Sequence, residues 1–374
     1  MFSQAYKLAI GVVVGAVVSA MVISEAKAVQ AELVADGLAH PWAVAFVGDG
    51  QMLVTERAGR LRLVDADGSV SEPLAGLPAI AAQRQGGLLD VITDREFDRN
   101  RTIYFCYSRP DPEQSGLNAT ALASAKLSQD GKSINGVRDL FVQGPSYRGG
   151  FHFGCRIVQG ADGTLWMGLG DRYQLMKEAQ NTANEIGKVI RINPDGSIPA
   201  DNPFASQSGA SAAVWSYGHR NIQGATLDRE GRLWTTEHGP QGGDELNLTE
   251  PGINYGWPVI TYGVNYGGGQ IGDGITSAPG MAQPVVHWTP SIAVSGLAVV
   301  DSDRYGPDWQ GSLMLGSLKF GHLVRLALEG DKVKAQEVVL PDLGQRVRDV
   351  RLGPDGLIYV LTDSPNGQLL RLLP

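Results

Sequence analysis

A short pattern of apolar residues recurs along the chain. Each copy begins with a turn of Gly, Asp or Asn, continues as an apolar or aromatic run typical of a β-strand, and stops at a polar residue or a glycine. The clearest copies are residues 162–167, 230–235 and 355–360. Six residues hold the same place in successive copies, at spacings of 51, 62, 68, 80 and 45: Leu53, Tyr104, Trp166, Trp234, Met314 and Tyr359.

Repeats of this length, with loops inserted between them, are typical of propeller blades. Helical periodicity is nearly absent apart from one short turn between 180 and 187, and no Pro- or Ser-rich linker divides the chain. The pattern therefore predicts an all-β fold, a single six-bladed β-propeller of four-stranded antiparallel blades over residues 29–374. Because equivalent strand ends meet at one face of a propeller, we expect residues 55–57, 170–172, 237–240 and 317–319 to surround one central site.

The first 28 residues predict a secretory signal peptide. Lys7 supplies a positive start, residues 8–23 form a mostly apolar run of 16 residues without charge, and Ala26-Lys27-Ala28 has the small-x-small form of a cleavage site. An uncleaved anchor is the alternative, although this run is short for a membrane span. We expect cleavage after residue 28 and a mature protein without a membrane span, in the periplasm or secreted.

Composition narrows the range of partners. Of the 374 residues 43% are hydrophobic and 19% charged, and the net charge is −8 without a cluster of Lys and Arg. An acidic chain of this kind argues against nucleic acid and anionic membranes as partners. In an oxidising compartment Cys106 and Cys155 could form a disulfide, which we favour slightly over the alternative of two small buried hydrophobic residues.

Several polar residues stand in glycine-rich segments. His152 lies among glycines and aromatic residues, where a general base can be both dry and reachable, although a structural histidine is the alternative. Gln85 precedes two glycines that let the backbone approach a ligand. Arg220 beside Asn221 suits bidentate recognition of a carboxylate.

Further cations and a calcium-type loop extend this set. Together with Arg220, the cations Lys319, Arg346 and Arg348 would place four positive charges on one face. Such a face would imply a multiply anionic ligand. Each could instead be a surface charge. The loop 237–245 combines carboxylates with exposed carbonyls among glycines, the oxygen ligands that Ca²⁺ prefers. The chain has no His/Cys spacing of a zinc site.

A series of motifs in fixed order carries a family resemblance over residues 30–374. They are His40-Pro41-Trp42, Gln85-Gly86-Gly87-Leu88-Leu89-Asp90, His152-Phe153-Gly154, Gly218-His219-Arg220-Asn221, Glu237-His238-Gly239-Pro240, Asn254-Tyr255-Gly256-Trp257-Pro258 and Arg346-Val347-Arg348-Asp349-Val350. In this combination the chain resembles the soluble pyrroloquinoline quinone (PQQ)-dependent aldose sugar dehydrogenases of the glucose/sorbosone dehydrogenase superfamily. The fold of that family is a six-bladed propeller, in agreement with the repeat count.

The resemblance implies PQQ and Ca²⁺ as cofactors and a role for each matching residue. His152 is expected to take the proton of the anomeric hydroxyl while hydride passes to the quinone. Gly239 and Pro240 are expected to bind a catalytic Ca²⁺ through main-chain carbonyls, and Glu245 and Tyr255 to bind a structural Ca²⁺. The expected PQQ-binding residues are Gln85, Arg220, Asn221, Tyr266, Ser317, Lys319, Arg346 and Arg348.

The implied reaction oxidises an aldose sugar to an aldonolactone and passes electrons to an external acceptor, in a protein that is a monomer or a homodimer. One position departs from the glucose-oxidising relatives, which carry an Asp just before the catalytic His. Here that residue is Phe151, so no Asp at this point can orient His152. Substrate contacts are expected in the inserted loops 202–211 and 267–279.

Two other functions are compatible with a propeller of this composition. A calcium-dependent lactone hydrolase would need a metal in the axial channel but no large anionic cofactor, so converging cations would have no role in it. A non-enzymatic propeller that binds a carbohydrate or a protein would need neither His152 nor the arginine pair.

Overall fold

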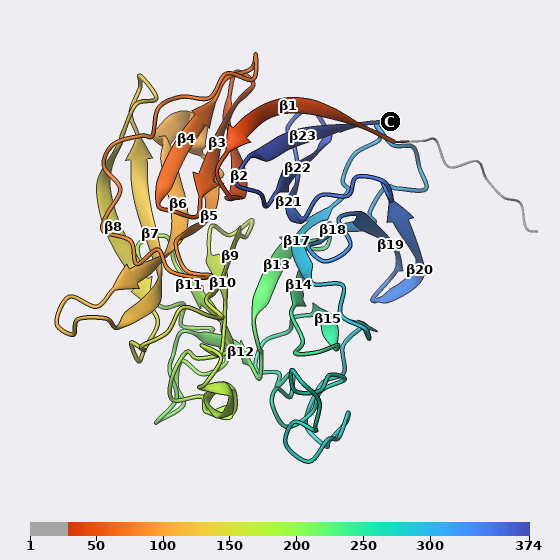
Figure 1. Cartoon of the computed structure of the whole chain (residues 1–374). Coiled ribbons are helices and arrows are strands. Elements are labelled where there is room, and N and C mark those ends of the chain that lie inside the picture. Colours follow the sequence, from red (N-terminus) through yellow and green to blue (C-terminus); the bar gives the residue numbers. More distant parts are fainter. Residues whose placement is uncertain (1–28) are drawn as a thin grey trace, which may run out of the picture.

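The computed structural model describes residues 29–374 as six antiparallel sheets arranged in a ring (Figure 1), so the predicted six-bladed propeller is confirmed. The predicted signal peptide, residues 1–28, lies outside the described residues. Within 29–374 no helix is long and apolar enough to cross a bilayer.

The blades follow one another along the chain. Blade 1 has β2 (Pro41–Gly48), β3 (Gln51–Glu56) and β4 (Arg60–Val64), and blade 2 has β5 (Leu88–Thr93), β6 (Thr102–Pro110), β7 (Asn118–Leu127) and β8 (Ile134–Val142). Blade 3 has β9 (Gly154–Gln159), β10 (Leu165–Leu169), β11 (Lys188–Ile192) and β12 (Val214–Tyr217), and blade 4 has β13 (Ile222–Leu227), β14 (Leu233–Glu237), β15 (Asp244–Leu248) and β16 (Val286–Trp288).

Blade 5 has β17 (Val294–Val299), β18 (Leu313–Ser317), β19 (Leu323–Glu329) and β20 (Lys332–Val339). Blade 6 has β21 (Val347–Leu352), β22 (Ile358–Thr362), β23 (Gly367–Leu373) and, as its outer strand, β1 (Gln30–Leu38). The helical segments are α1 (Phe97–Asn100) and the 3₁₀ turn η1 (Met176–Gln180).

The fourth strand position of blade 1 is irregular. The backbone N–H groups of Ser71 and Leu74 donate to the carbonyls of Leu63 and Leu61 in β4, but Pro73 between them has no N–H to continue the ladder. Only a single bridge, Val64 to Val70, is formed there, so the sheet has three regular strands.

The six residues of the sequence repeat occupy the same strand in every blade. They lie in β3, β6, β10, β14, β18 and β22, the second strand of each sheet. The first strands of the blades lie innermost, where each contacts the first strand of the next blade. Equivalent sequence positions therefore take equivalent places around the axis, which is why the repeat predicted the architecture.

Two features fasten the ring. The first strand of the described chain, β1, pairs antiparallel with the last, β23, from Gln30 opposite Leu373 to Leu38 opposite Gly367, and so completes blade 6. This pairing holds the first and last described strands in one sheet through main-chain hydrogen bonds. A disulfide between Cys106 in β6 and Cys155 in β9 joins blades 2 and 3, which confirms the favoured pairing.

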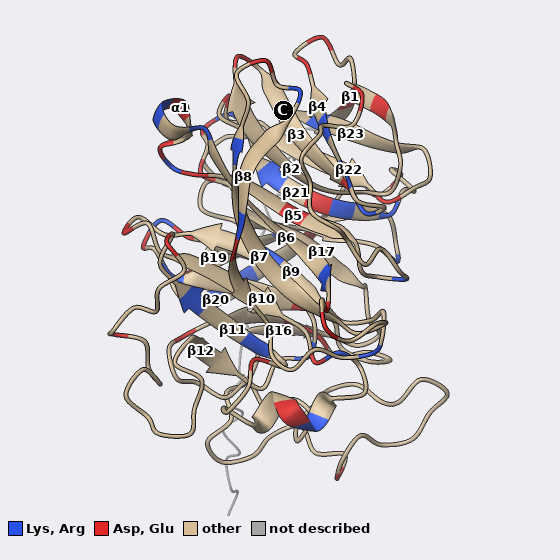
Figure 2. Ribbon diagram, turned by 90° about the vertical axis from the view of Figure 1, so that its left-hand side faces the viewer, with Lys and Arg blue, Asp and Glu red and all other residues tan. Residues whose placement is uncertain are grey.

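Charged residues lie mostly in the turns and loops, where both signs are interspersed (Figure 2). Among the buried charged residues is a cluster on the axis, in which Arg156 binds Asp90 (3.3 Å) and Asp349 (2.8 Å), and Arg351 binds the same two carboxylates (2.5 and 3.0 Å). Asp349 also accepts the backbone N–H of Val44. The cluster is neutral in sum and connects the inner strands of blades 1, 2, 3 and 6.

We predict that Arg156→Met destabilises the protein strongly, because Asp90 and Asp349 would then share one arginine in a buried site. Removing one partner of a buried ion pair costs about 3–5 kcal/mol. Urea unfolding should show this loss, whereas Arg99→Met at an exposed surface position should change the free energy of unfolding by less than about 0.5 kcal/mol. A loss below about 1 kcal/mol for Arg156→Met would show that the cluster is dispensable.

Candidate active site

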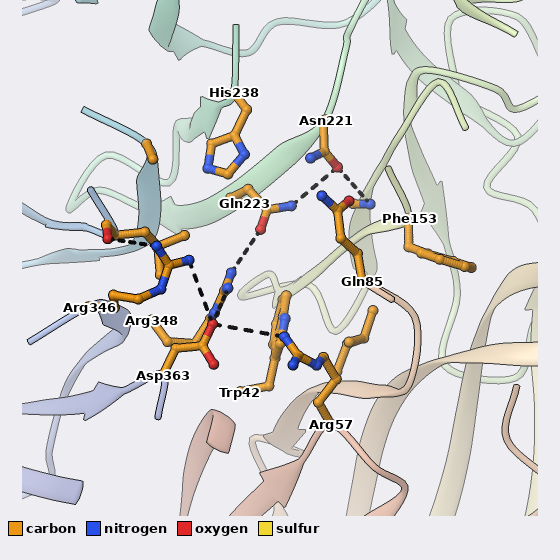
Figure 3. Close-up of a pocket in the computed structure, with 14 residues that line it drawn as sticks. Trp42, Arg57, Gln85, Phe153, Asn221, Gln223, His238, Arg346, Arg348 and Asp363 are labelled. Atoms are coloured by element: carbon orange, nitrogen blue, oxygen red, sulfur yellow. Dashed lines mark hydrogen bonds and ion pairs between the residues drawn. The ribbon is translucent and has the colours of Figure 1, made fainter. Parts of the chain in front are cut away.

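A cavity of about 190 Å³ lies where the strands of all six blades converge (Figure 3). Three of the four strand ends expected at this face reach the lining, through Arg57, His238 and Leu318, while residues 170–172 lie beside it through the contact of Asp171 with His152. The lining consists of Trp42, Arg57, Gln85, Leu89, Phe153, Gly154, Asn221, Gln223, His238, Ala293, Leu318, Arg346, Arg348 and Asp363.

Positive charge predominates in this lining. Arg348 binds Asp363 at 2.7 Å, while Arg57 and Arg346 lie 3.9 Å from the same carboxylate. Although burial opposes it, Arg348, a hydrogen bond with His40 and the charge of Arg57 hold the pKa of Asp363 far below its usual range, so it is ionised. Three guanidinium groups thus face one carboxylate in the cavity wall, and the excess charge suits an anionic ligand.

His152 lies beside the cavity with its ring held in one orientation. Its Nδ1 is 2.6 Å from Oδ1 of Asp171, and its backbone N–H donates to the side-chain oxygen of Gln85 at 2.9 Å. Asp171 is fully buried and ionised, so it accepts a proton that sits on Nδ1. Trp257 donates to the other oxygen of Asp171 at 2.8 Å and fixes the carboxylate. Nε2 of His152 has no partner within residues 29–374.

The local environment keeps His152 neutral. Burial of the ring and the nearby positive charge of Arg220 lower the pKa of His152 below its usual 6.5, although Asp171 opposes this. Gly170 allows the strand end that carries Asp171 to pass closely beneath the histidine, because a Cβ there would lie 2.1 Å from the carbonyl oxygen of His152. A neutral imidazole with Nδ1–H bound and Nε2 free is suited to accept a proton.

Asp171 fills the role that Phe151 cannot. The sequence placed residues 170–172 at the central face, but it gave no reason to pair Asp171 with His152, 19 positions earlier. Only the packing of β10 beside the loop before β9 brings the two together. The ring of Tyr173 also meets His152 edge-on at 5.2 Å.

Arg220 and Asn221 connect the cavity to the loop after β14. Nη1 of Arg220 donates to the carbonyls of His238 and Gly239 at 2.9 and 2.8 Å. Its Nε is buried and has no hydrogen-bond partner within residues 29–374. Oδ1 of Asn221 accepts the backbone N–H of Gly154 at 3.2 Å. An unpartnered buried guanidinium N–H is a donor for an incoming anion.

The predicted binding residues divide between this cavity and its surroundings. Gln85, Asn221, Arg346 and Arg348 line the cavity. Ser317 is fully buried next to the lining residue Leu318, with its hydroxyl donating to the carbonyl of Ile292. Lys319, Tyr266 and Pro240 line a second hollow nearby, where Lys319 donates to the carbonyl of Ser291 and Tyr266 is 64% exposed.

Glu245 and Tyr255 lie away from the cavity. Glu245 is paired in the ladder opposite Glu237, and burial together with the charge of Glu237 raises the pKa of Glu245 to about 8. The phenol of Tyr255 donates to the carbonyl of Leu248, which leaves its own carbonyl as its possible metal ligand. No group of three or more His, Cys, Asp or Glu side chains with metal-site geometry occurs within 29–374.

Sequence reasoning missed part of the cavity wall. Arg57 and His238 belong to the strand ends expected at this face, but no role had been assigned to them. Asp363 follows the second strand of blade 6, and Asp171 lies two residues after the second strand of blade 3. The sequence repeat therefore indicated that Asp363 lies at a strand end on the face of the site. Nothing in the sequence indicated that Gln223 lines the cavity or that Trp42 lies between two arginines.

Comparison with known proteins agrees with the geometry. The sequence model of the glucose/sorbosone dehydrogenase family matches residues 38–371. The aldose sugar dehydrogenase YliI of Escherichia coli is 43% identical over 349 residues, 92% of this chain and 93% of that protein. The crystal structure of the soluble aldose sugar dehydrogenase of Escherichia coli in its apo form matches with a TM-score of 0.88 at 42% identity, over 92% of this chain and 99% of that one.

A PQQ-bound aldose sugar dehydrogenase from Streptomyces coelicolor matches with a TM-score of 0.74 at 27% identity, over 92% of this chain and 98% of that one. The family match thus extends over nearly all of the described propeller, including every strand that contributes to the cavity. The chain belongs to the glucose/sorbosone dehydrogenase family.

Proposed function

We propose that this protein is a PQQ- and Ca²⁺-dependent aldose dehydrogenase that oxidises the anomeric carbon of a sugar to an aldonolactone. The observation that carries the proposal is the buried His152–Asp171 pair beside a cavity with excess positive charge. A lactone hydrolase or a binding propeller would not require that excess. The predicted signal peptide further supports export to the periplasm, where electrons would pass to an external acceptor.

The residues of the cavity fit PQQ, which carries three carboxylates. Arg57, Arg346 and Arg348 offer more positive charge than Asp363 neutralises, and the unpartnered Nε of Arg220 offers a further donor. Asn221 and Gln85 would add amide groups from neighbouring blades. When bound, PQQ supplies the oxidant, a quinone that accepts the two electrons and the C1 hydrogen that the sugar loses.

Main-chain carbonyls after β14 suit a Ca²⁺ ion. The carbonyl oxygen of Gly239 accepts a hydrogen bond from the guanidinium of Arg220, so it already faces a positive charge. Ca²⁺ prefers oxygen ligands of this kind. Pro240, Ser317, Lys319 and Tyr266 would complete the surroundings of cofactor and metal from the second hollow and the strand end of β18.

A second Ca²⁺ is proposed at Glu245 and the carbonyl of Tyr255. The carboxylates of the partly buried Glu245 and the buried Glu237 belong to residues paired in one ladder, and desolvation together with the charge of Glu237 raises the pKa of Glu245 to about 8. A divalent cation would remove this repulsion and keep both groups ionised.

The chain's own residues would perform the proton transfer. Asp171 holds Nδ1–H of His152, so Nε2 faces the reaction as a neutral base and takes the proton of the anomeric hydroxyl. Gln85 holds the backbone of His152, and Trp257 holds Asp171, so the base cannot turn away.

The direct test is oxidation of aldoses by the purified protein loaded with PQQ and Ca²⁺, scored by reduction of a dye. We predict that His152→Gln lowers kcat by about 10²–10⁴-fold while PQQ still binds, because the variant lacks the base. Arg99→Gln, at an exposed position on α1, is the control and should behave as wild type. Undiminished turnover by His152→Gln would reject the assigned role.

The pH dependence should report the depressed pKa of His152. A base whose pKa lies below 6.5 stays neutral as the pH falls through 6.5, so kcat/KM should decline only at lower pH. In Asp171→Asn the decline of kcat/KM on the acid side should move to still lower pH, because the carboxylate charge that raises the pKa of His152 is gone. The kcat of this variant should fall by about 10²-fold, because the ring of His152 is no longer held in its orientation. A decline of wild-type kcat/KM that begins above pH 7 as the pH is lowered would contradict this description of the site.

Calcium should stabilise the fold through Glu245. A saturating ion adds about 2.7 kcal/mol at 100 times its Kd, which we expect to raise Tm by several degrees at pH 8. Below pH 8 the ion must displace a proton from Glu245, so the shift should shrink as the pH falls. Glu245→Gln should abolish most of the shift at every pH. If that variant kept the full shift, the ion would bind elsewhere.

A further inference from the structure

Arg84 presents a guanidinium without an acidic partner at the approach to His152. The residue is exposed, and its guanidinium lies over the ring of Phe151 at 5.1 Å. Within residues 29–374 this side chain makes no ion pair and no hydrogen bond. Surface arginines elsewhere in the chain are commonly paired, as Arg99 is with Glu96 and Arg229 with Asp301.

The position of Arg84 is fixed by the same turn that holds the base. Its backbone is left-handed, with φ of 54°, and the following residue, Gln85, donates its N–H to the carbonyl of Gly150. The side chain of Gln85 in turn accepts the N–H of His152. A Cβ on Gly150 would lie 3.0 Å from Cβ of Arg84, so the two segments are in close contact. A left-handed arginine costs free energy and persists only where its surroundings require it.

A continuous wall of side chains leads from the base to this guanidinium. The ring of Tyr173 meets His152 at 5.2 Å and Phe151 at 5.7 Å, and Arg84 covers Phe151. Aromatic faces of this kind stack against sugar rings, and Tyr173 is 44% exposed. The acidic group nearest the base, Asp171, is buried and bound to His152 and Trp257, so it does not neutralise Arg84.

We propose that Arg84 binds an anionic group at the end of the aldose remote from C1, so that the site prefers acidic aldoses such as hexuronates. The planar fork of an arginine suits a carboxylate, and a terminal phosphate is the other source of the same charge. The guanidinium of Arg84 lies over the uncharged ring of Phe151, so the residue in contact with it does not neutralise its charge. The inference rests on the proposed function, and the reaction at C1 is the one given above, with the remote anionic group unchanged.

The test compares kcat/KM for glucuronate, glucose 6-phosphate and glucose in the protein loaded with PQQ and Ca²⁺. In wild type the ratio of glucuronate to glucose should exceed one and should fall with added salt, because the contact is exposed. Arg84→Gln should lower this ratio by roughly 5- to 20-fold through the KM of glucuronate, and Arg84→Lys should restore part of it. Arg99→Gln removes a distant surface charge and should leave the ratio unchanged.

Calorimetric titration of the same proteins with glucuronate separates this inference from the proposed function. Arg84-dependent binding without turnover of any aldose would support Arg84 as the anion site and reject the dehydrogenase. Turnover of neutral aldoses with a ratio that Arg84→Gln does not change would overturn the inference alone. A preference for glucose 6-phosphate over glucuronate, lost in Arg84→Gln, would assign the site to a phosphate.

Discussion

The ring of blades depends on two arginines and two aspartates that are buried together on its axis. Arg156 and Arg351 each bind both Asp90 and Asp349, so inner strands from separate blades are fixed to one another by charge as well as by packing. Trp42 carries this constraint toward the cavity, because its ring lies 4.2 Å from the guanidinium of Arg156 and 6.0 Å from that of Arg348. The cations of the cavity are therefore held by a part of the core that cannot shift independently.

The same interior sets the electrostatics of the site. Burying a guanidinium is costly unless it is paired, and Asp363 offsets that cost for Arg348. Arg57 and Arg346 lie 3.9 Å from the same carboxylate, and Arg346 also donates to the carbonyl of Leu318. On the other side of the cavity, Arg220 and desolvation keep His152 neutral and Asp171 keeps its ring oriented. A cavity that attracts anions therefore lies beside a base that is free of its proton near neutral pH.

The sequence was sufficient for the fold because the repeat is periodic. The equivalence of residues such as Trp166, Trp234 and Tyr359 predicted the second strand of each blade, and the rule that strand ends converge predicted the face of the site. The sequence could not predict contacts between blades, since they depend on packing rather than on spacing. The His152–Asp171 pair is one such contact, and the guanidinium of Arg57 facing Asp363 is another.

Other differences come from side-chain direction. Lys319 was grouped with the cavity cations because it follows β18, yet its ammonium donates to Ser291 in the second hollow, while its neighbour Leu318 lines the cavity. Tyr266 likewise lies in the inserted loop beside that hollow. A position at a strand end determines the face on which a residue lies, but the local turn determines which cavity its side chain enters.

We propose that these converging cations form the site of a multiply anionic quinone, held with the help of Ca²⁺. Titration of the purified, metal-stripped protein with PQQ, with and without Ca²⁺ and followed by absorbance, tests it most directly. One-to-one binding that depends on Ca²⁺, weakens with salt and weakens further in Arg346→Gln is the predicted result. Failure to bind PQQ in either condition would contradict this assignment and leave a propeller of this family without its cofactor.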